Sequence, residues 1–226
     1  GEPDMVSTEV FPREGAEWTN IWITEALYYD RTRVACIGDS ITFNYRPIVG
    51  NIFYPQNIMI DMLAGSRMCG DPAFYKELEM FFGPASGYKY DVIHFNNGLH
   101  GCCNNTQLDL DIYVKGYKEC IELIRRLQPE AKIILATSTH MTFEDHTPEL
   151  LKKKNDMVIE RNEFVRRYAE ENGYMLNDLY KIVAGHNDEY PQVDGVHFGE
   201  EGKKVLADAV VDMVNKALGR ENVSAE

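Results

Sequence analysis

The stretch Arg33-Val34-Ala35-Cys36-Ile37-Gly38-Asp39-Ser40 decides the fold, because it joins an apolar run to a glycine turn that carries a serine. The run 33–37 is typical of a buried strand in a parallel sheet, and Gly38 allows a tight turn where the strand ends. A serine in such a turn exposes its hydroxyl and its backbone N–H to the same space, as a nucleophilic serine must. A serine here can also simply cap the helix that follows.

Strand-like runs recur beyond this stretch, separated by amphipathic segments. They cover residues 33–38, 57–64, 91–96, 132–138 and a weaker 174–177. Asp71-Pro72 and Thr147-Pro148 each provide a capping residue and a proline at the start of a helix, the second of which is expected to run to Gly173. Strands that alternate with helices predict an α/β fold: a three-layer α/β/α sandwich with a five-stranded parallel sheet, flavodoxin-like in type.

The length of 226 residues suits one sizeable core and is short for two. Residues 1–30 show no clear period, and we expect them to form an N-terminal arm pinned to the body by Trp18 and Trp22. Residues 31–226 are then expected to form a single catalytic domain.

The charge balance argues against two classes of partner. The chain has 23 basic and 36 acidic side chains, a formal charge of −13, which repels phosphate backbones and anionic membranes. No apolar stretch approaches the ~20 residues that span a bilayer. We therefore expect neither nucleic acid binding nor membrane insertion. An exported location is favoured, with a signal segment that this sequence does not show, and the oligomeric state is left open.

A second decisive stretch, Asp194-Gly195-Val196-His197, lies near the other end of the chain. A serine becomes a useful nucleophile when an imidazole takes its proton and a carboxylate fixes that imidazole. Taken alone, an Asp-x-x-His pattern is also typical of a solvated turn. In doubly wound sheets, however, ligands bind beyond the carboxyl ends of the strands, and both stretches are predicted to lie there. We therefore predict a catalytic group of Ser40, His197 and Asp194.

At these two stretches the chain resembles the SGNH hydrolases, also called the GDSL esterase/lipase family. The matching blocks are Gly38-Asp39-Ser40-Ile41-Thr42 and Asp194-Gly195-Val196-His197, and the family's sandwich fold agrees with the pattern from residue 33 onward. The resemblance implies that Ser40 is the nucleophile, His197 the base and Asp194 the residue that orients it.

The resemblance also implies an oxyanion hole, to which Ser40 contributes its backbone N–H. The family's second block supplies a glycine N–H, and Ser66-Arg67-Met68-Cys69-Gly70-Asp71 resembles that block, with Gly70 as the donor and Gly65 as the alternative. Either glycine could instead be a plain turn residue.

The third block departs from the family pattern, which is Gly-x-Asn-Asp. The chain reads Phe95-Asn96-Asn97-Gly98-Leu99-His100-Gly101, so that aligning Gly98 with the family glycine puts His100 where asparagine is expected. An imidazole N–H can donate to an oxyanion, with altered pH behaviour. Asn97 is the alternative donor. An oxyanion donor is worth roughly 3–4 kcal/mol in acyl transfer, so we expect one of the two to donate.

We predict no cofactor and no metal. The chain has no phosphate-binding glycine loop of the Walker or dinucleotide type, and its five cysteines form no CxxC pair. His140 and His146, with Glu144 and Asp145 between them, are potential ligands, but nothing else in the sequence supports a metal site there. His140 could equally be a structural histidine or a substrate contact.

The rim of the predicted cleft is polar and aromatic and has no long aliphatic run for a lipid-binding lid. Its residues are Phe43, Asn44, Tyr45, Tyr54, His100, Asn104, Asn105, Tyr190 and Gln192. Such a rim suits a hydrated ligand such as a sugar, although the same aromatics could serve packing. We expect a serine esterase that removes short acyl groups, most plausibly acetyl, from a carbohydrate through an acyl-serine. The alternatives are a lipase or thioesterase, acyl transfer to another alcohol, and a non-catalytic glycan-binding module.

Overall fold

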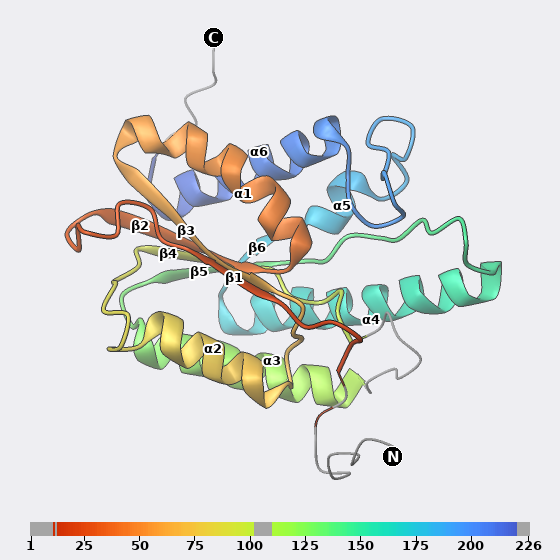
Figure 1. Ribbon diagram of the computed structural model, residues 1–226, viewed down its shortest axis with the longest axis horizontal. Coiled ribbons are helices and arrows are strands. Elements are labelled where there is room, and N and C mark those ends of the chain that lie inside the picture. Colours follow the sequence, from red (N-terminus) through yellow and green to blue (C-terminus); the bar gives the residue numbers. More distant parts are fainter. Residues whose placement is uncertain (1–10, 12, 102–109, 221–226) are drawn as a thin grey trace, which may run out of the picture.

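A central sheet lies between two layers of helices in the computed structural model, which describes residue 11 and residues 13–101 and 110–220 (Figure 1). The strands are β1 Thr19–Trp22, β2 Thr32–Gly38, β3 Ile58–Gly65, β4 Val92–Phe95, β5 Lys132–Ala136 and β6 Met175–Asn177. They lie in the order β1-β3-β2-β4-β5-β6. From β3 to β6 all neighbours are parallel, which confirms the predicted five-stranded parallel sheet in flavodoxin-like order.

The sheet also has a sixth strand, β1, in addition to the five predicted parallel strands. β1 pairs antiparallel with the outer edge of β3, with Thr19 opposite Gly65 and Trp22 opposite Met62. All four residues of β1 are exposed, so the strand shows none of the apolar alternation by which a half-buried strand is found in a sequence.

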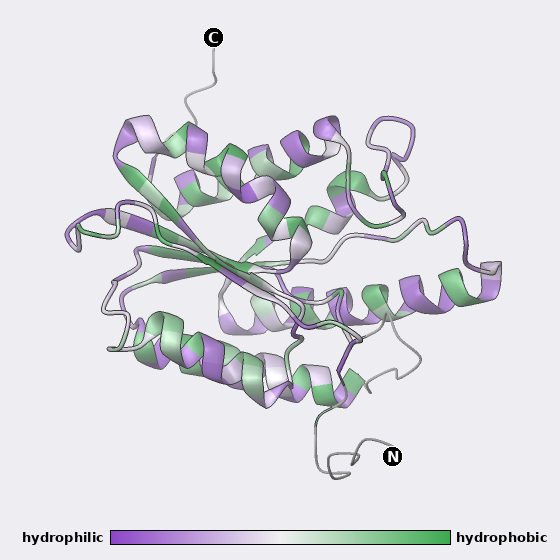
Figure 2. Cartoon of the chain, in the orientation of Figure 1, coloured by the Kyte–Doolittle hydropathy of each residue, from purple (hydrophilic) through white to green (hydrophobic). Residues whose placement is uncertain are grey.

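The helices divide between the two faces of the sheet. Together with a short 3₁₀ turn, Tyr54–Gln56, they are α1 Ser40–Phe53, α2 Pro72–Phe82, α3 Leu110–Leu127, α4 Pro148–Asn172, α5 Leu179–Val183 and α6 Glu200–Ala217. α1, α5 and α6 cover one face, and α2, α3 and α4 cover the other (Figure 1). The strands are mainly apolar, and the helices carry both hydrophobic and hydrophilic residues (Figure 2). Each face therefore buries its own apolar cluster.

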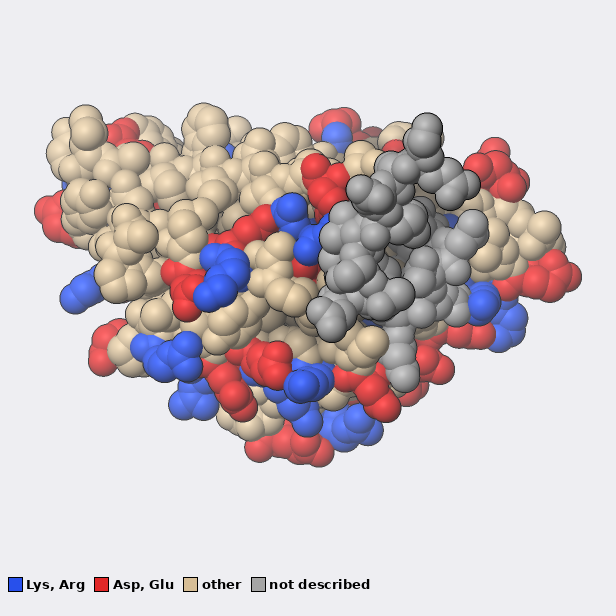
Figure 3. Space-filling model, turned by 60° about the horizontal axis from the view of Figure 1, so that its bottom comes forward, with Lys and Arg blue, Asp and Glu red and all other residues tan. Residues whose placement is uncertain are grey.

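The predicted helix starts are confirmed by their caps. The Asp71 carboxylate accepts the N–H of Ala73 at 2.8 Å, and the Thr147 hydroxyl accepts that of Leu150 at 3.2 Å. Gly173 ends α4 with φ of 68°, a left-handed conformation that glycine adopts without strain. On the face that α2 and α3 cover, acidic and basic side chains are interspersed (Figure 3).

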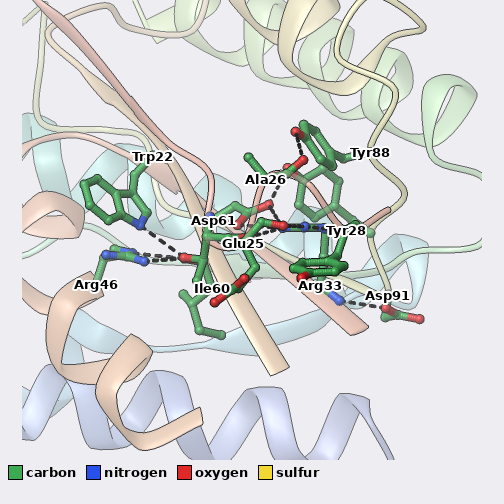
Figure 4. A network of polar contacts seen from close by, with 12 residues as sticks. Trp22, Glu25, Ala26, Tyr28, Arg33, Arg46, Ile60, Asp61, Tyr88 and Asp91 are labelled. Carbon is green, nitrogen blue, oxygen red and sulfur yellow. Dashed lines mark hydrogen bonds and ion pairs between the residues drawn. The ribbon is translucent and has the colours of Figure 1, made fainter. Parts of the chain in front are cut away.

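The described part of the N-terminal arm is held mainly by polar contacts. Trp18 and Trp22 are 36% and 53% exposed, and each contacts a side chain of α1: Trp18 meets Phe43 edge-on at 6.4 Å, and the Arg46 guanidinium lies 5.2 Å from the Trp22 ring. The arm is also fixed by the β1–β3 pairing and by the buried pair of Arg33 and Asp61, joined at 3.0 Å. The Arg33 guanidinium also donates to the carbonyls of Thr24, Glu25 and Tyr28 (Figure 4). The division into an arm of residues 1–30 and a domain of 31–226 stays a prediction.

Among the helices in the described ranges, none has both the length and the apolar composition needed to cross a membrane.

Candidate active site

The turn after β2 places Ser40 at the carboxyl edge of the sheet. A Cβ on Gly38 would lie 2.0 Å from Thr42 Oγ1 and 2.6 Å from the carbonyl oxygen of Asn96, so a side chain has no room there. Asp39 then caps α1 by accepting the N–H of Ile41 at 2.9 Å. Asp39, and not Ser40, is therefore the N-cap, and Ser40 is the first residue of the helix.

Ser40, His197 and Asp194 form one continuous chain of hydrogen bonds. Ser40 Oγ lies 2.7 Å from His197 Nε2, across 157 residues of sequence. His197 Nδ1 lies 2.6 Å from Asp194 Oδ2. Because Asp194 is acceptor-only when ionised, Nδ1 carries a proton and Nε2 is the nitrogen that can take the serine proton. The structure thus brings together all three residues of the predicted catalytic group.

The Asp194 carboxylate is fixed by its own loop. Its Oδ1 accepts the backbone N–H groups of Val196 at 3.0 Å and of His197 at 2.8 Å. Partial burial raises the pKa of Asp194, but the hydrogen bonds from His197 and Val196 outweigh it and hold that pKa below its usual range. The Asp194 carboxylate therefore stays ionised beside the His197 imidazole.

Asp39 is a site residue to which the sequence analysis gave no role. Its side chain is 3% exposed. Burial raises the pKa of its carboxyl, and the opposing effects include the charges of both His100 and His197. Two imidazoles thus act on one carboxyl beside Ser40. An aspartate directly before a helix is typical of an N-cap, and this pattern could have predicted the position of Asp39 at the start of α1.

The third block brings His100 to this side of the sheet. Parallel β2 and β4 are neighbours, with Ile37 opposite Phe95, so the segments that leave their carboxyl ends lie side by side. His100 Nδ1 contacts the Glu14 carboxylate at 2.7 Å. No signal in the sequence connects Glu14 to this site, because 86 residues separate the pair.

The Asn97 amide is engaged with the second block. It accepts the N–H of Cys69 at 3.1 Å and donates to the carbonyl of Arg67 at 2.9 Å. Asn97 is 2% exposed and holds the 67–69 loop in place. An oxyanion role for Asn97 would break these contacts.

The two candidate glycines of the second block pack against other elements. The backbone of Gly70 lies on α3, where a Cβ on Gly116 would fall 2.1 Å from the Gly70 nitrogen. Gly65 faces β1, where its own Cβ would lie 2.7 Å from the carbonyl oxygen of Trp18. No described contact joins either glycine to Ser40, and the oxyanion role of Gly70 stays a prediction.

A buried polar network involves residues of α1, the helix that Ser40 begins. Tyr45, which we expected on the rim, is fully buried, and its hydroxyl contacts Thr42, Asn96 and His94. Burial lowers the pKa of His94 to about 3, so this histidine is neutral at ordinary pH.

An open cavity of about 390 Å³ adjoins the catalytic loop. It lies between residues 142–145 and 192–195 and includes Asp194 itself. On another part of the rim, Phe43 is 44% exposed and contacts Trp18 edge-on at 6.4 Å. The predicted rim residues Asn104 and Asn105 lie outside the described residues.

The two histidines weighed as metal ligands have separate partners. His140 Nε2 contacts Asn187 Oδ1 at 2.7 Å, and His146 contacts Asp145 and Lys154. Within the described part of the chain, no group of three histidine, cysteine, aspartate or glutamate side chains could hold a metal ion.

Solved structures share this fold. A GDSL-like lipase from Bacteroides thetaiotaomicron has a TM-score of 0.65 at 17% identity, covering 82% of this chain and 89% of its own. A carbohydrate esterase family 3 protein from Talaromyces cellulolyticus has a TM-score of 0.67 at 14% identity, covering 84% and 100%. An acetyl xylan esterase has a TM-score of 0.62 at 20% identity, covering 80% and 99%.

Among curated proteins, none matches this chain. The sequence itself matches the GDSL-like Lipase/Acylhydrolase family over residues 36–205, a region that contains Ser40, Asp194 and His197. This confirms the resemblance stated from the two motifs. The chain therefore belongs to the GDSL-like lipase/acylhydrolase family and is a carboxylic ester hydrolase.

Proposed function

We propose that this protein hydrolyses short-acyl esters, chiefly acetyl esters of carbohydrates, through an acyl-serine on Ser40. The observation that carries the proposal is the unbroken chain of hydrogen bonds from Ser40 Oγ through His197 to Asp194, at 2.7 and 2.6 Å. Such a chain lets a serine hydroxyl lose its proton as it attacks a carbonyl carbon.

In the first step, Ser40 Oγ forms a bond to the ester carbonyl carbon while His197 Nε2 takes the hydroxyl proton. The carbonyl oxygen becomes an oxyanion, which the backbone N–H of Ser40 and the side chain of His100 stabilise. The tetrahedral intermediate collapses, the bond to the alkoxy oxygen breaks, and His197 returns the proton to the leaving alcohol.

The second step repeats this chemistry with water. His197 takes a proton from a water molecule as the water oxygen bonds to the acyl carbon. The bond to Ser40 Oγ then breaks, Ser40 recovers its proton from His197, and the carboxylic acid leaves. Asp194 keeps the imidazole oriented and its charged form stabilised throughout.

The cleft surroundings support a small acyl group and a hydrated alcohol. The cavity beside Asp194 is lined largely by polar groups, among them Thr142, Glu144, Asp145 and Gln192. An exposed aromatic ring, Phe43, follows Ser40 by one helical turn and suits stacking on a sugar. Two of the similar structures are named as a carbohydrate esterase and an acetyl xylan esterase, but at 14% and 20% identity their likeness concerns the fold.

A panel of p-nitrophenyl esters and acetylated sugars tests the proposal. We expect Ser40→Ala to abolish hydrolysis with an unchanged circular dichroism spectrum, and a serine-directed phosphonate to label the wild type at Ser40. Retained activity in Ser40→Ala would remove Ser40 from the mechanism. We also expect acetyl esters to react faster than octanoyl esters; the opposite order would favour a lipase or thioesterase.

A further inference from the structure

A second imidazole–carboxylate pair lies on the nucleophile's side of the sheet. His100 Nδ1 and Glu14 Oε1 are 2.7 Å apart, nearly the separation of His197 Nδ1 and Asp194 Oδ2. Both members of the second pair are partly buried, at 18% and 21% exposure. This protects their charge interaction from much of the solvent screening that weakens surface pairs.

His100 is positioned by the sheet. It follows β4 by five residues, and β4 is the parallel neighbour of β2, which leads into Ser40. The carbonyl of Asn96, at the start of the same segment, lies against Gly38. The carboxyl of Asp39 responds to the charges of both His100 and His197, which puts both imidazoles near the residue that precedes Ser40.

The contact with Glu14 determines which ring atoms carry protons. A carboxylate only accepts hydrogen bonds, so Nδ1 of His100 is the protonated, donating nitrogen. In a neutral ring Nε2 would then be an acceptor, which would repel an oxyanion. Only the doubly protonated ring offers an Nε2–H, and the Glu14 carboxylate stabilises that charged form.

We propose that Glu14 of the N-terminal arm is a positioning residue that keeps His100 doubly protonated, so that His100 Nε2–H donates to the oxyanion. This inference rests on the proposed acyl-serine mechanism. It assigns opposite tasks to the two pairs: His197 must be neutral to accept a proton, and His100 must be charged to donate a hydrogen bond.

Among the described residues, other charged groups that act near His100 include an aspartate, an arginine and the second imidazole. Asp39 lies at the start of α1, Arg161 of α4 donates to the His100 carbonyl at 2.7 Å, and His197 acts on the same Asp39 carboxyl. Glu14 is the carboxylate in direct contact with the ring. Removing its charge should therefore have the largest effect on His100 protonation.

Hydrogen bonds close to Glu14 in the sequence hold the N-terminal arm against the body. The N–H of Glu14 donates to Glu17 Oε1 at 3.2 Å, and Glu17 Oε2 accepts the Ser66 hydroxyl at 2.5 Å. The N–H of Trp18 donates to the same hydroxyl at 2.9 Å, directly before β1. The arm thus reaches the site from a rigid edge of the sheet.

The test is the pH profile of p-nitrophenyl acetate hydrolysis by the full-length Glu14→Gln variant. We expect kcat/KM to fall about tenfold, mainly in kcat, because a donor to the transition state is weakened. We also expect the alkaline limb of the profile to move to lower pH, because without the carboxylate the ring loses its second proton more easily. Glu14→Asp should recover part of both losses.

A double variant separates this role from a purely structural one. His100→Asn supplies an amide N–H that needs no protonation, so adding Glu14→Gln to it should cause no further loss and no pH shift. Glu25→Gln, which removes a carboxylate of the same arm whose Oε1 accepts the Tyr54 hydroxyl, is the matched control and should leave activity unchanged.

Two results would overturn the proposal: an unaltered pH profile in Glu14→Gln, or the same tenfold loss in the His100→Asn background. If the wild type neither reacts with a serine-directed phosphonate nor loses activity in Ser40→Ala, the proposed function fails instead. The two failures are therefore distinguishable.

Discussion

The two imidazole–carboxylate pairs have similar contacts and very different origins. His197 and Asp194 are three residues apart, and the loop that carries them also supplies the N–H groups that fix the carboxylate. His100 and Glu14 are 86 residues apart, and they meet because β1 and the contacts of Arg13 with Asp71 and of Glu17 with Ser66 fasten the arm to the body. The first pair is a local motif that a sequence displays, whereas the second is a product of tertiary structure.

The difference also separates two chemical tasks. In the proposed mechanism the local pair cycles between neutral and charged during each turnover, so its geometry has to survive a change of protonation. The distant pair is proposed to keep one protonation state, and a carboxylate brought in from another segment is sufficient for that. Variants of each pair can therefore be compared at matched positions.

The largest expected contrast is between the two imidazoles. His197→Ala removes the base and should lower kcat by about 10⁶, close to the effect of losing the nucleophile. His100→Ala removes one oxyanion donor and should lower kcat by about 10² to 10³. Steady-state rates for p-nitrophenyl acetate measure both. Equal losses in the two variants would erase the proposed division of roles.

The next contrast is between the two carboxylates. Asp194→Asn should lower kcat by about 10⁴, because an amide can hold the imidazole in the wrong tautomer. This loss far exceeds the tenfold loss expected for Glu14→Gln. The pH profiles from pH 5 to 10 should differ as well, with a shifted alkaline limb in the Glu14 variant. A similar loss in both would mean that Glu14 does more than adjust a donor.

The smallest expected effect tests how the arm supports the distant pair. Ser66→Ala removes a hydroxyl that binds Glu17 and Trp18, so Glu14 should contact His100 less often. We expect a loss of a few-fold in kcat, since a net hydrogen bond contributes about 1 kcal/mol. The rate of phosphonate labelling of Ser40 should fall less than after any change at His197. A loss as large as that of Asp194→Asn would show that Ser66 supports the local pair too.

The sequence predicted the parts of the molecule that depend on local signals. Buried strands read as apolar runs, Asp71 and Thr147 marked their helices, and Asp194 and His197 lay close enough to be recognised together. The family match and the shared fold confirm the predicted family and fold class, and the structure confirms the two helix starts.

What the sequence did not predict depends on contacts between remote segments. β1 is an exposed edge strand without alternation, so it looked like irregular arm. The Asn97 amide binds a loop that precedes it by about 30 residues, and Tyr45 lies on α1 with its side chain in the core, although its type suited a rim. No sequence pattern around Glu14 or His100 indicates that the two residues are in contact.

The fully buried Arg33 limits how far the chain can be shortened from its N-terminal side. Two nitrogens of its guanidinium donate to the backbone carbonyls at positions 24, 25 and 28, which a truncation before the first parallel strand would delete. Such a trimmed product would keep Asp61 but lose three of the four residues that bind this cation, and a hydrogen bond to a charged group typically contributes about 1.5–3 kcal/mol. A stable shortened version should therefore include residues 24–28, because Arg33 binds their carbonyl oxygens. These residues precede the region that matches the family, 36–205.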